Sequence, residues 1–372
     1  MADLPTGTVT FLFTDVEGST RFALERLERD GAEDVRRRHS SYFYELVEEG
    51  APRLLFDAEW LDRLEAEHDN IRATLARTLH EGEAEHLLQL LSRLWRFWSV
   101  HGHWQEGCTW LESGLSTTAD LRTPERAQVL EGAADLAWRQ GRYDEGRVFL
   151  DESLELWREL GDRRGATGSL HFRGNLELAA GNNVEARTLW EEAQQAWREL
   201  GDAERFAATV YNLGLAASAE SDDDRAVGQF EESLALARRE GLGILEALST
   251  QSLGFALMKT HRRAEAAVLL REALLAHTRL GDRQAIAICL IALAEASELD
   301  GEPLRAARLL AAADALIQEI GFAFQADLRR RHEGLKSRLV ALVGSEEFAA
   351  VSAEGAELDQ ERAVEYALTE ID

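Results

Sequence analysis

A short stretch near the N-terminus has the residue types of a site for a metal ion and a triphosphate. In "TFLFTDVEGSTRF" an apolar run ends at Phe13, and Asp15, Gly18, Ser19 and Thr20 follow. A carboxylate is a common Mg²⁺ ligand, and a glycine lets the backbone approach a phosphate closely. The pattern predicts the start of a catalytic domain, provided that other elements supply the remaining site residues.

A second group of chemically capable residues lies between Leu94 and Trp110, where the chain has four tryptophans together with His101 and His103. An aromatic ligand pocket or a metal pair is one interpretation. We favour the other, in which the large rings fill the space between two helices. His-x-His without a third ligand is weak evidence for a metal site, so we expect none here.

Two further features favour structural roles. The acidic segment "ESDDDRA" lacks the spacing and glycine of a calcium loop, which predicts a solvated turn with a helix cap. Cys108 and Cys289 form neither a disulfide framework nor a zinc motif, so we expect a reducing cytoplasm.

Composition limits the classes of partner. The chain has 372 residues and a formal net charge of −27, which argues against nucleic acid because basic residues dominate affinity for phosphate. No apolar stretch reaches the roughly 18 residues of a membrane span, and no signal peptide is recognisable. We therefore expect a soluble cytoplasmic protein without nucleic-acid or membrane partners.

The elements that would position any site come from an internal repeat. Small residues and large residues each recur every 40 positions. Glycine does so at Gly161, Gly201, Gly241, Gly281 and Gly321. Other series in the same register are Gly174/Gly214/Gly254, Ala186/Ala226/Ala266/Ala306, Leu150/Trp190/Phe230/Leu270/Leu310 and Ser153/Ala193/Ser233/Ala273/Ala313. Small residues let two helices approach closely, and the bulky residue fills the gap beside them.

One unit shows how each copy should fold. In "VEARTLWEEAQQAWREL" apolar residues recur at helical spacing, namely Val184, Leu189, Trp190, Ala193 and Trp197. Gly201 then suits the left-handed position that ends a helix, and Asp202 suits the cap of the next one. Breaks such as "AGNN", "QGRYD" and "DGEP" separate the two helices of a unit. Each unit is thus predicted to be a helical hairpin that buries its apolar face by stacking on its neighbours.

This pattern resembles the tetratricopeptide repeat, with a longer period than that family's usual one. A divergent copy with Trp95, Gly107, Leu111 and Gly114 precedes the others. We predict an all-α fold with about six repeats over residues 85–330, a helical cap over 331–372, and a helical linker over 22–84.

The sequences on either side of the repeats resemble parts of bacterial multidomain signal-transduction ATPases. "WLDRLEAEHDNIRATLART" resembles the region that follows their nucleotide-binding and winged-helix domains. The tail "LVGSEEFAAVSAEGAELDQERAVEYAL" resembles the stretch before a LuxR-type DNA-binding domain. The resemblance implies the repeat arm of such a regulator.

The opening "LPTGTVTFLFTDVEGSTR" resembles the first strand and turn of a class III adenylate or guanylate cyclase, in which the residue matching Asp15 binds metal. Residues 1–21 would then be a truncated, vestigial start, left by a large internal deletion. Asp57 lacks the glycine-flanked hairpin of that family's second metal ligand, and no Gly-x-x-x-x-Gly-Lys-Ser/Thr phosphate loop is present. We therefore expect no catalytic residues, no cofactor and no metal.

A repeat arm of this type presents its first helices on a concave side, where aromatic, amide and charged groups suit a protein or peptide. The predicted partner-binding residues are Trp138, Arg139, His171, Asn175, Tyr211, Asn212, Leu215, Gln251, Phe255 and Lys259. An ordinary solvated groove is the alternative interpretation of this face.

The leading functional hypothesis is a non-catalytic protein-interaction or ligand-sensing module of a transcriptional or signalling regulator. Two alternatives stay open, namely a class III cyclase completed by another chain and a decayed fragment without function. The sequence leaves the partner and the oligomeric state undetermined.

Overall fold

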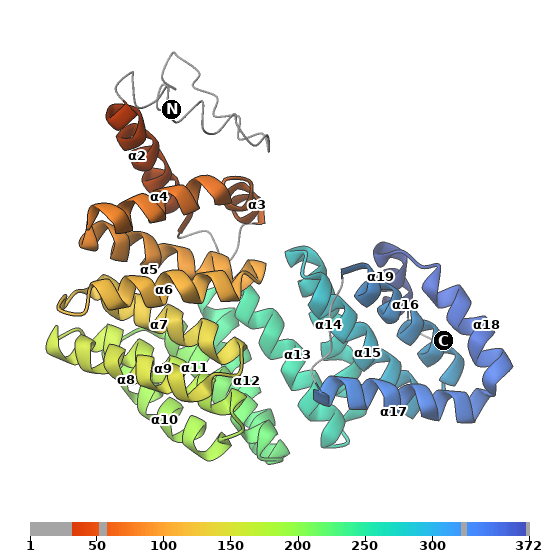
Figure 1. Ribbon diagram of the computed structural model, residues 1–372. Helices are drawn as coiled ribbons and strands as arrows, with labels where there is room; N and C mark the ends of the chain where they lie inside the picture. The colour runs from red at the N-terminus through yellow and green to blue at the C-terminus, as the bar shows by residue number, and fades with distance from the viewer. Residues whose placement is uncertain (1–31, 52–57, 321–325, 370–372) are drawn as a thin grey trace. The chain divides into compact units, whose positions relative to one another are not determined.

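A computed structural model of the chain describes residues 32–51, 58–320 and 326–369 (Figure 1). These residues form helices joined by short turns, and no strand occurs among them. The predicted all-α fold of stacked hairpins is confirmed. Asp15, Asp57 and the predicted N-terminal strand lie outside the described residues. No helix in the described ranges is both long and apolar enough to cross a membrane.

Contacts divide the chain into two compact units, residues 1–160 and 161–372. Among its described residues, the first unit has the helices α2 (Ala32–Gly50), α3 (Ala58–Ala66), α4 (His68–Glu81), α5 (Ala84–His101), α6 (Trp104–Thr117), α7 (Pro124–Arg139) and α8 (Tyr143–Glu159). Trp95 and Trp98 are buried between the helices of this unit, as expected for hairpin packing, whereas Trp104 and Trp110 are only half-buried.

In the part of the second unit that the structure describes, four hairpins are followed by three helices. Its hairpin helices are α9 (Arg163–Ala179), α10 (Asn183–Leu200), α11 (Ala203–Ala219), α12 (Asp223–Glu240), α13 (Gly243–Lys259), α14 (Arg263–Leu280), α15 (Arg283–Leu299) and α16 (Pro303–Ile320). The last three are α17 (Ala326–Val343), α18 (Ser345–Ala356) and α19 (Gln360–Leu368). Leu335, Leu339, Val351 and Val364 join these three helices to the core of α15 and α16.

The turns of the second unit have the predicted capping chemistry. Gly201 has a φ of 70° at the end of α10, the left-handed conformation that glycine adopts without a Cβ clash. The side chain of Asp202 then accepts a hydrogen bond of 3.0 Å from the backbone N–H of Arg205 and caps α11. Asp222 caps α12 in the same way, so the acidic segment is a helix-capping turn as predicted.

The paired small and large residues bring the two helices of each hairpin into close contact. A Cβ at Gly174 would lie 2.4 Å from Trp190 Nε1, and one at Gly214 would lie 2.6 Å from Phe230 Cε1. Both distances are too short for a real side chain. The 40-residue spacing of these glycines therefore reflects a packing requirement as well as helical periodicity.

The predicted apolar face of α10 was wrong for Val184, which is 62% exposed. The buried residues of this helix are Ala186, Trp190, Ala193 and Trp197, at spacings of three and four. Val184 precedes Ala186 by two positions, which places its side chain about 200° away around the helix.

Candidate functional site

The predicted partner-binding residues of the second unit occupy successive first helices. His171 and Asn175 lie on α9, whereas Tyr211, Asn212 and Leu215 lie on α11. Gln251, Phe255 and Lys259 lie on α13. Most of these positions are four residues apart within a helix and 40 apart between helices, so the repeat aligns equivalent side chains on one face.

Hydrogen bonds connect three of these side chains between α9 and α11. Asn212 Nδ2 lies 3.1 Å from His171 Nε2 and donates to Asn175 Oδ1 over 3.0 Å. His171 Nδ1 lies 3.1 Å from Thr209 Oγ1. All three predicted side chains are half-buried, so the network is partly screened from water.

The hydrogen bonds of this network indicate that the His171 imidazole is neutral. Thr209 donates its hydroxyl proton to the carbonyl of Arg205 over 2.7 Å, so its oxygen accepts from His171 Nδ1–H. Nε2 then accepts from the Asn212 amide. Burial, followed by the positive charge of Arg205, lowers the pKa of His171 to about 4. The imidazole is therefore uncharged at neutral pH.

Tyr211 directly precedes Asn212 of this cluster on α11. Its hydroxyl lies 3.2 Å from Ser252 Oγ on α13, and its ring centroid lies 5.6 Å from that of Phe230. Leu215 packs against the same hydrophobic core. Burial raises the pKa of Tyr211, so the phenol stays protonated and able to donate a hydrogen bond.

The three predicted residues on α13 have different surroundings. Gln251 is buried, with its amide nitrogen 3.4 Å from the Ala285 carbonyl and 3.2 Å from Cys289 Sγ on α15. Phe255 is half-buried beneath the Arg331 guanidinium. Lys259 is exposed and pairs with Asp223 at 3.3 Å. Of this set, Phe255 and Lys259 offer the more accessible surface.

Trp138 and Arg139 belong to the first unit, on α7. Asp135 accepts hydrogen bonds from Trp138 Nε1 at 3.1 Å and from Arg139 Nε at 2.8 Å. Asp135 also accepts from Ser99 Oγ at 2.7 Å. The carboxylate thus fixes both predicted side chains within their own unit.

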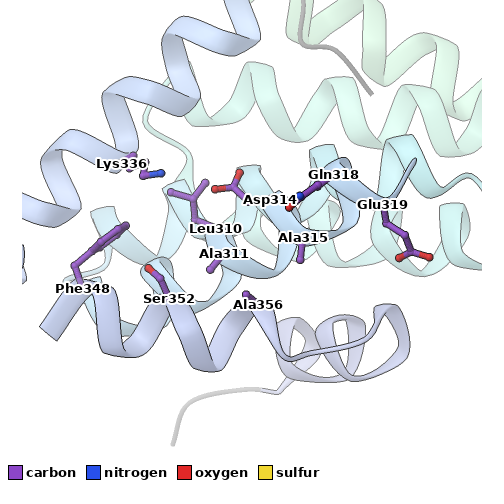
Figure 2. Close-up of a pocket in the computed structure, with 10 residues that line it drawn as sticks. All are labelled: Leu310, Ala311, Asp314, Ala315, Gln318, Glu319, Lys336, Phe348, Ser352 and Ala356. Carbon is purple, nitrogen blue, oxygen red and sulfur yellow. The ribbon is translucent and has the colours of Figure 1, made fainter. Parts of the chain in front are cut away.

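A cleft in the second unit was missed by sequence reasoning. It has a volume of about 490 Å³, with α16 as its floor, Lys336 from α17 on one side and Phe348 from α18 on the other (Figure 2). Asp314 and Glu319 also line it. Its residues come from three helices without a shared repeat register, so no periodic signal marks it.

Few described side chains are arranged for metal or thiol chemistry. Burial raises the pKa of Cys289 to about 12 and also raises that of Cys108, which makes both thiols poor nucleophiles at neutral pH. In the described ranges, a group of potential metal ligands consists of Glu65, His68 and His103 in the first unit.

Sequence comparison connects this architecture to known proteins. Residues 166–239 match the tetratricopeptide repeat family. Proteins described as HTH-type transcriptional regulators in Mycobacterium bovis and Mycobacterium tuberculosis are 31% identical over 156 residues, which is 40% of this chain. The aligned region spans only 18% of the length of these relatives.

Solved structures extend the fold relationship over most of the chain. Aspartyl phosphate phosphatase F from Bacillus subtilis superposes with a TM-score of 0.60 at 12% identity, over 92% of this chain and 93% of its own. A Pyrococcus horikoshii signal transduction ATPase with numerous domains and a tetratricopeptide repeat sensor gives 0.57 at 13% identity, over 85% of this chain and 46% of its own.

A Rap protein complexed with competence and sporulation factor gives a TM-score of 0.51 at 14% identity, over 87% of this chain and 99% of its own. These identities establish shared fold alone. The chain is therefore an all-helical repeat protein with tetratricopeptide-like hairpins.

Proposed function

We propose that this chain is a protein-interaction or peptide-sensing module of a signalling regulator and that it binds its partner on the α9, α11 and α13 face. The observation that carries the proposal is the hydrogen-bonded group of His171, Asn175 and Asn212 beside Tyr211. Such a combination of neutral polar groups and an aromatic ring suits an extended or helical peptide.

The asparagines retain unused hydrogen-bonding capacity. Asn175 Nδ2 and Asn212 Oδ1 have no hydrogen-bond partner among the described side chains and backbone groups. Together they offer one donor and one acceptor, which match the C=O and N–H of a peptide backbone. Because their other amide atoms are already held in the network, little side-chain entropy would be lost on binding.

The neutral state of His171 supports the same interpretation. A peptide backbone carries no net charge, and an uncharged imidazole adds no unpaired charge to the interface. Because the chain is strongly acidic overall, with a net charge of −27, long-range repulsion disfavours acidic partners and leaves a neutral or basic peptide as the better match.

The comparisons support the functional class. One neighbour in fold is described as complexed with competence and sporulation factor, and another carries a repeat sensor on a signal transduction ATPase. The mycobacterial relatives are described as transcriptional regulators. We carry the sensing role to this chain as a proposal, since the shared part is a small fraction of those regulators.

The test begins with a peptide-display selection against the purified full chain. Binding of a selected peptide is then compared with Asn175→Ala, Tyr211→Ala and the double variant. We expect the double variant to weaken binding at least thirtyfold, about 2 kcal/mol, because truncated hot-spot residues cost about that amount. Glu192→Lys on α10 is the control, since this exposed residue lies on a second helix.

Thermal unfolding of every variant shows whether the face itself has been disrupted, because Tyr211 also packs on Phe230. Tyr211→Phe, which keeps the ring, should retain most of the binding. If Glu192→Lys abolishes binding and the folded double variant does not, the face has been assigned wrongly.

We also propose that the chain has no catalytic activity. Purified protein incubated with ATP or GTP and Mn²⁺ should form no cyclic nucleotide. Turnover that disappears in Asp15→Ala would instead favour the cyclase alternative.

A further inference from the structure

The α5–α6 turn brings histidines into contact with the α3–α4 corner of the same unit. Glu65 is near the end of α3, His68 is the first residue of α4, and His103 is the N-cap of α6. One ligand atom from each of these residues lies within 4.8 Å of the other two. Residues more than 30 positions apart in sequence thus form one compact group of nitrogen and oxygen atoms.

The interatomic distances are close to those of a metal site. Glu65 Oε2 lies 2.8 Å from His103 Nε2 and 3.9 Å from His68 Nδ1. Around a tetrahedral zinc ion with ligand bonds of 2.0–2.1 Å, neighbouring ligand atoms are separated by about 3.3 Å. The observed pair of distances brackets this value, so small side-chain rotations suffice to bring the atoms to coordination distance.

The second observation concerns the buried His68. This residue is 5% exposed, and its Nε2 has no hydrogen-bond partner among the described atoms. The nearest carboxylate oxygen, Glu106 Oε1, lies 3.3 Å away but does not satisfy hydrogen-bond geometry. A buried ring nitrogen without a hydrogen bond costs free energy, which a bound group that reorients the ring would recover.

Metal coordination would satisfy both nitrogens of His68. If Nδ1 binds the ion, Nε2–H faces Glu106, and a rotation of the ring aligns it for donation. A metal-bound histidine commonly donates its second N–H to a carboxylate in this manner. Glu106 is already held in place by the Nε and Nη2 atoms of Arg72, at 2.7 Å and 2.5 Å.

We propose that Glu65, His68 and His103 form a binding site for a divalent first-row transition-metal ion, with Zn²⁺ as its preferred occupant. Two imidazoles and one carboxylate are a ligand set that zinc accepts, and a water molecule would complete the tetrahedron. The buried ring of Phe97 packs against His68 and His103, with centroids 5.0 Å and 5.8 Å apart, and provides an apolar wall.

The fold brings to His103 the additional metal ligands that the sequence around it lacks. His101-x-His103 has no third ligand nearby in sequence, and the α3–α4 corner contributes two. His101 Nδ1 lies 3.7 Å from Glu65 Oε2, outside the compact group, and its ring stacks parallel to that of His103. The ion would therefore connect the α3–α4 corner to the first hairpin of the repeat array.

Binding is tested with the full chain, freed of any affinity tag and of metal. Isothermal titration with Zn²⁺ and metal analysis after dialysis give the affinity and stoichiometry. We expect one ion per chain, and at least roughly tenfold weaker binding for Glu65→Gln and for His103→Ala. His86→Ala is the matched control, because His86 lies in the same unit with a side chain that is 62% exposed.

Co²⁺ gives a second measurement that reports ligand geometry. A tetrahedral site should produce intense visible absorption in the wild-type chain and in His86→Ala, and this absorption should be lost in both ligand variants. Their side chains are 42% and 29% exposed, so these variants are expected to fold, which circular dichroism verifies. Absence of saturable binding, or binding that is unchanged in both ligand variants, would overturn the proposal.

Discussion

Gly174 provides a direct test of the close helix approach in each hairpin. The ideal Cβ of an alanine at this position would lie 2.4 Å from Trp190 Nε1 and 2.7 Å from Trp190 Cδ1. Relieving that overlap requires the helices or the indole to move, so we expect Gly174→Ala to destabilise the protein by about 1–3 kcal/mol. Urea unfolding measures the change.

Two comparisons make this test specific. Gly228→Ala on α12 has open space around its Cβ and should be neutral or stabilising, because alanine favours helix. The equivalent positions in α15 and α16 hold Ala294 and Leu310, both buried, so Trp190→Leu should relieve part of the Gly174→Ala defect. Equal destabilisation by Gly174→Ala and Gly228→Ala would show that backbone propensity, and not packing, sets the glycine register.

His171 should make stability depend on pH below neutrality. An unfolded histidine has a pKa of about 6.5, whereas that of His171 in the folded chain is lowered to about 4. Between these values the unfolded chain binds a proton that the folded chain does not. The free energy of unfolding should therefore fall as pH decreases from about 6.5 to about 4, with no contribution from His171 above that range.

His171→Gln keeps an acceptor for Asn212 and removes the titration. The difference in unfolding free energy between wild type and this variant, measured by urea unfolding at several pH values, isolates His171. Burial also lowers the pKa of His68 and of His277, but their contributions are common to both proteins and cancel. A constant difference from pH 7.5 to pH 4.5 would contradict the neutral assignment.

The turn inside each hairpin contains a left-handed residue at a fixed place in the repeat. Gly141, Gly181 and Gly301 occupy this place with φ values of 77°, 84° and 85°, whereas Ser221 and His261 adopt 62° and 63°. This backbone conformation is about 1–2 kcal/mol less favourable for a residue with a Cβ. Glycine relieves that strain, although it adds entropy to the unfolded chain.

We therefore expect Ser221→Gly and His261→Gly each to stabilise the protein by about 0.5–1 kcal/mol and to raise the melting temperature. Both residues are exposed, so little packing is lost. Gly181→Ser, the reciprocal change, should destabilise by a similar amount. A lower melting temperature for both glycine variants would mean that the side chains of Ser221 and His261 compensate for their backbone strain.

The hairpin helices were predictable because their signals are local and repeated. Gly201 and Asp202 predict a helix end and the next helix start, and the Gly174–Trp190 register predicts close packing. The Glu65–His68–His103 group could not be predicted in this way. Its members come from α3, from α4 and from the residue before α6, and no 40-residue period relates Glu65 and His68 to His103.

In the candidate site, too, the repeat predicts some features and not others. The repeat register correctly aligned His171 with Tyr211 and Asn175 with Leu215 on successive first helices. It did not predict that Asn212 hydrogen-bonds to both residues on α9, or that Gln251 is buried against α15. Side-chain reach and local burial decide these contacts, and periodicity carries no information about either.

The charge of the whole chain should govern how salt affects its stability. With 68 acidic and 41 basic residues, the net charge of −27 opposes compaction through long-range repulsion. Exposed ion pairs act in the other direction, as between Arg163 and Glu199, but each contributes only about 0–1 kcal/mol. We expect repulsion to dominate at low ionic strength.

Raising NaCl from about 0.01 M to about 0.1 M shortens the Debye length from about 30 Å to about 10 Å and screens this repulsion. The melting temperature of metal-free protein should therefore rise over this range. Neutralising the exposed Glu192 and Glu232 with glutamine, which has a similar helix propensity, should raise the low-salt melting temperature and reduce the salt dependence. A melting temperature that falls with added NaCl would instead show that the inter-helix ion pairs outweigh the net charge.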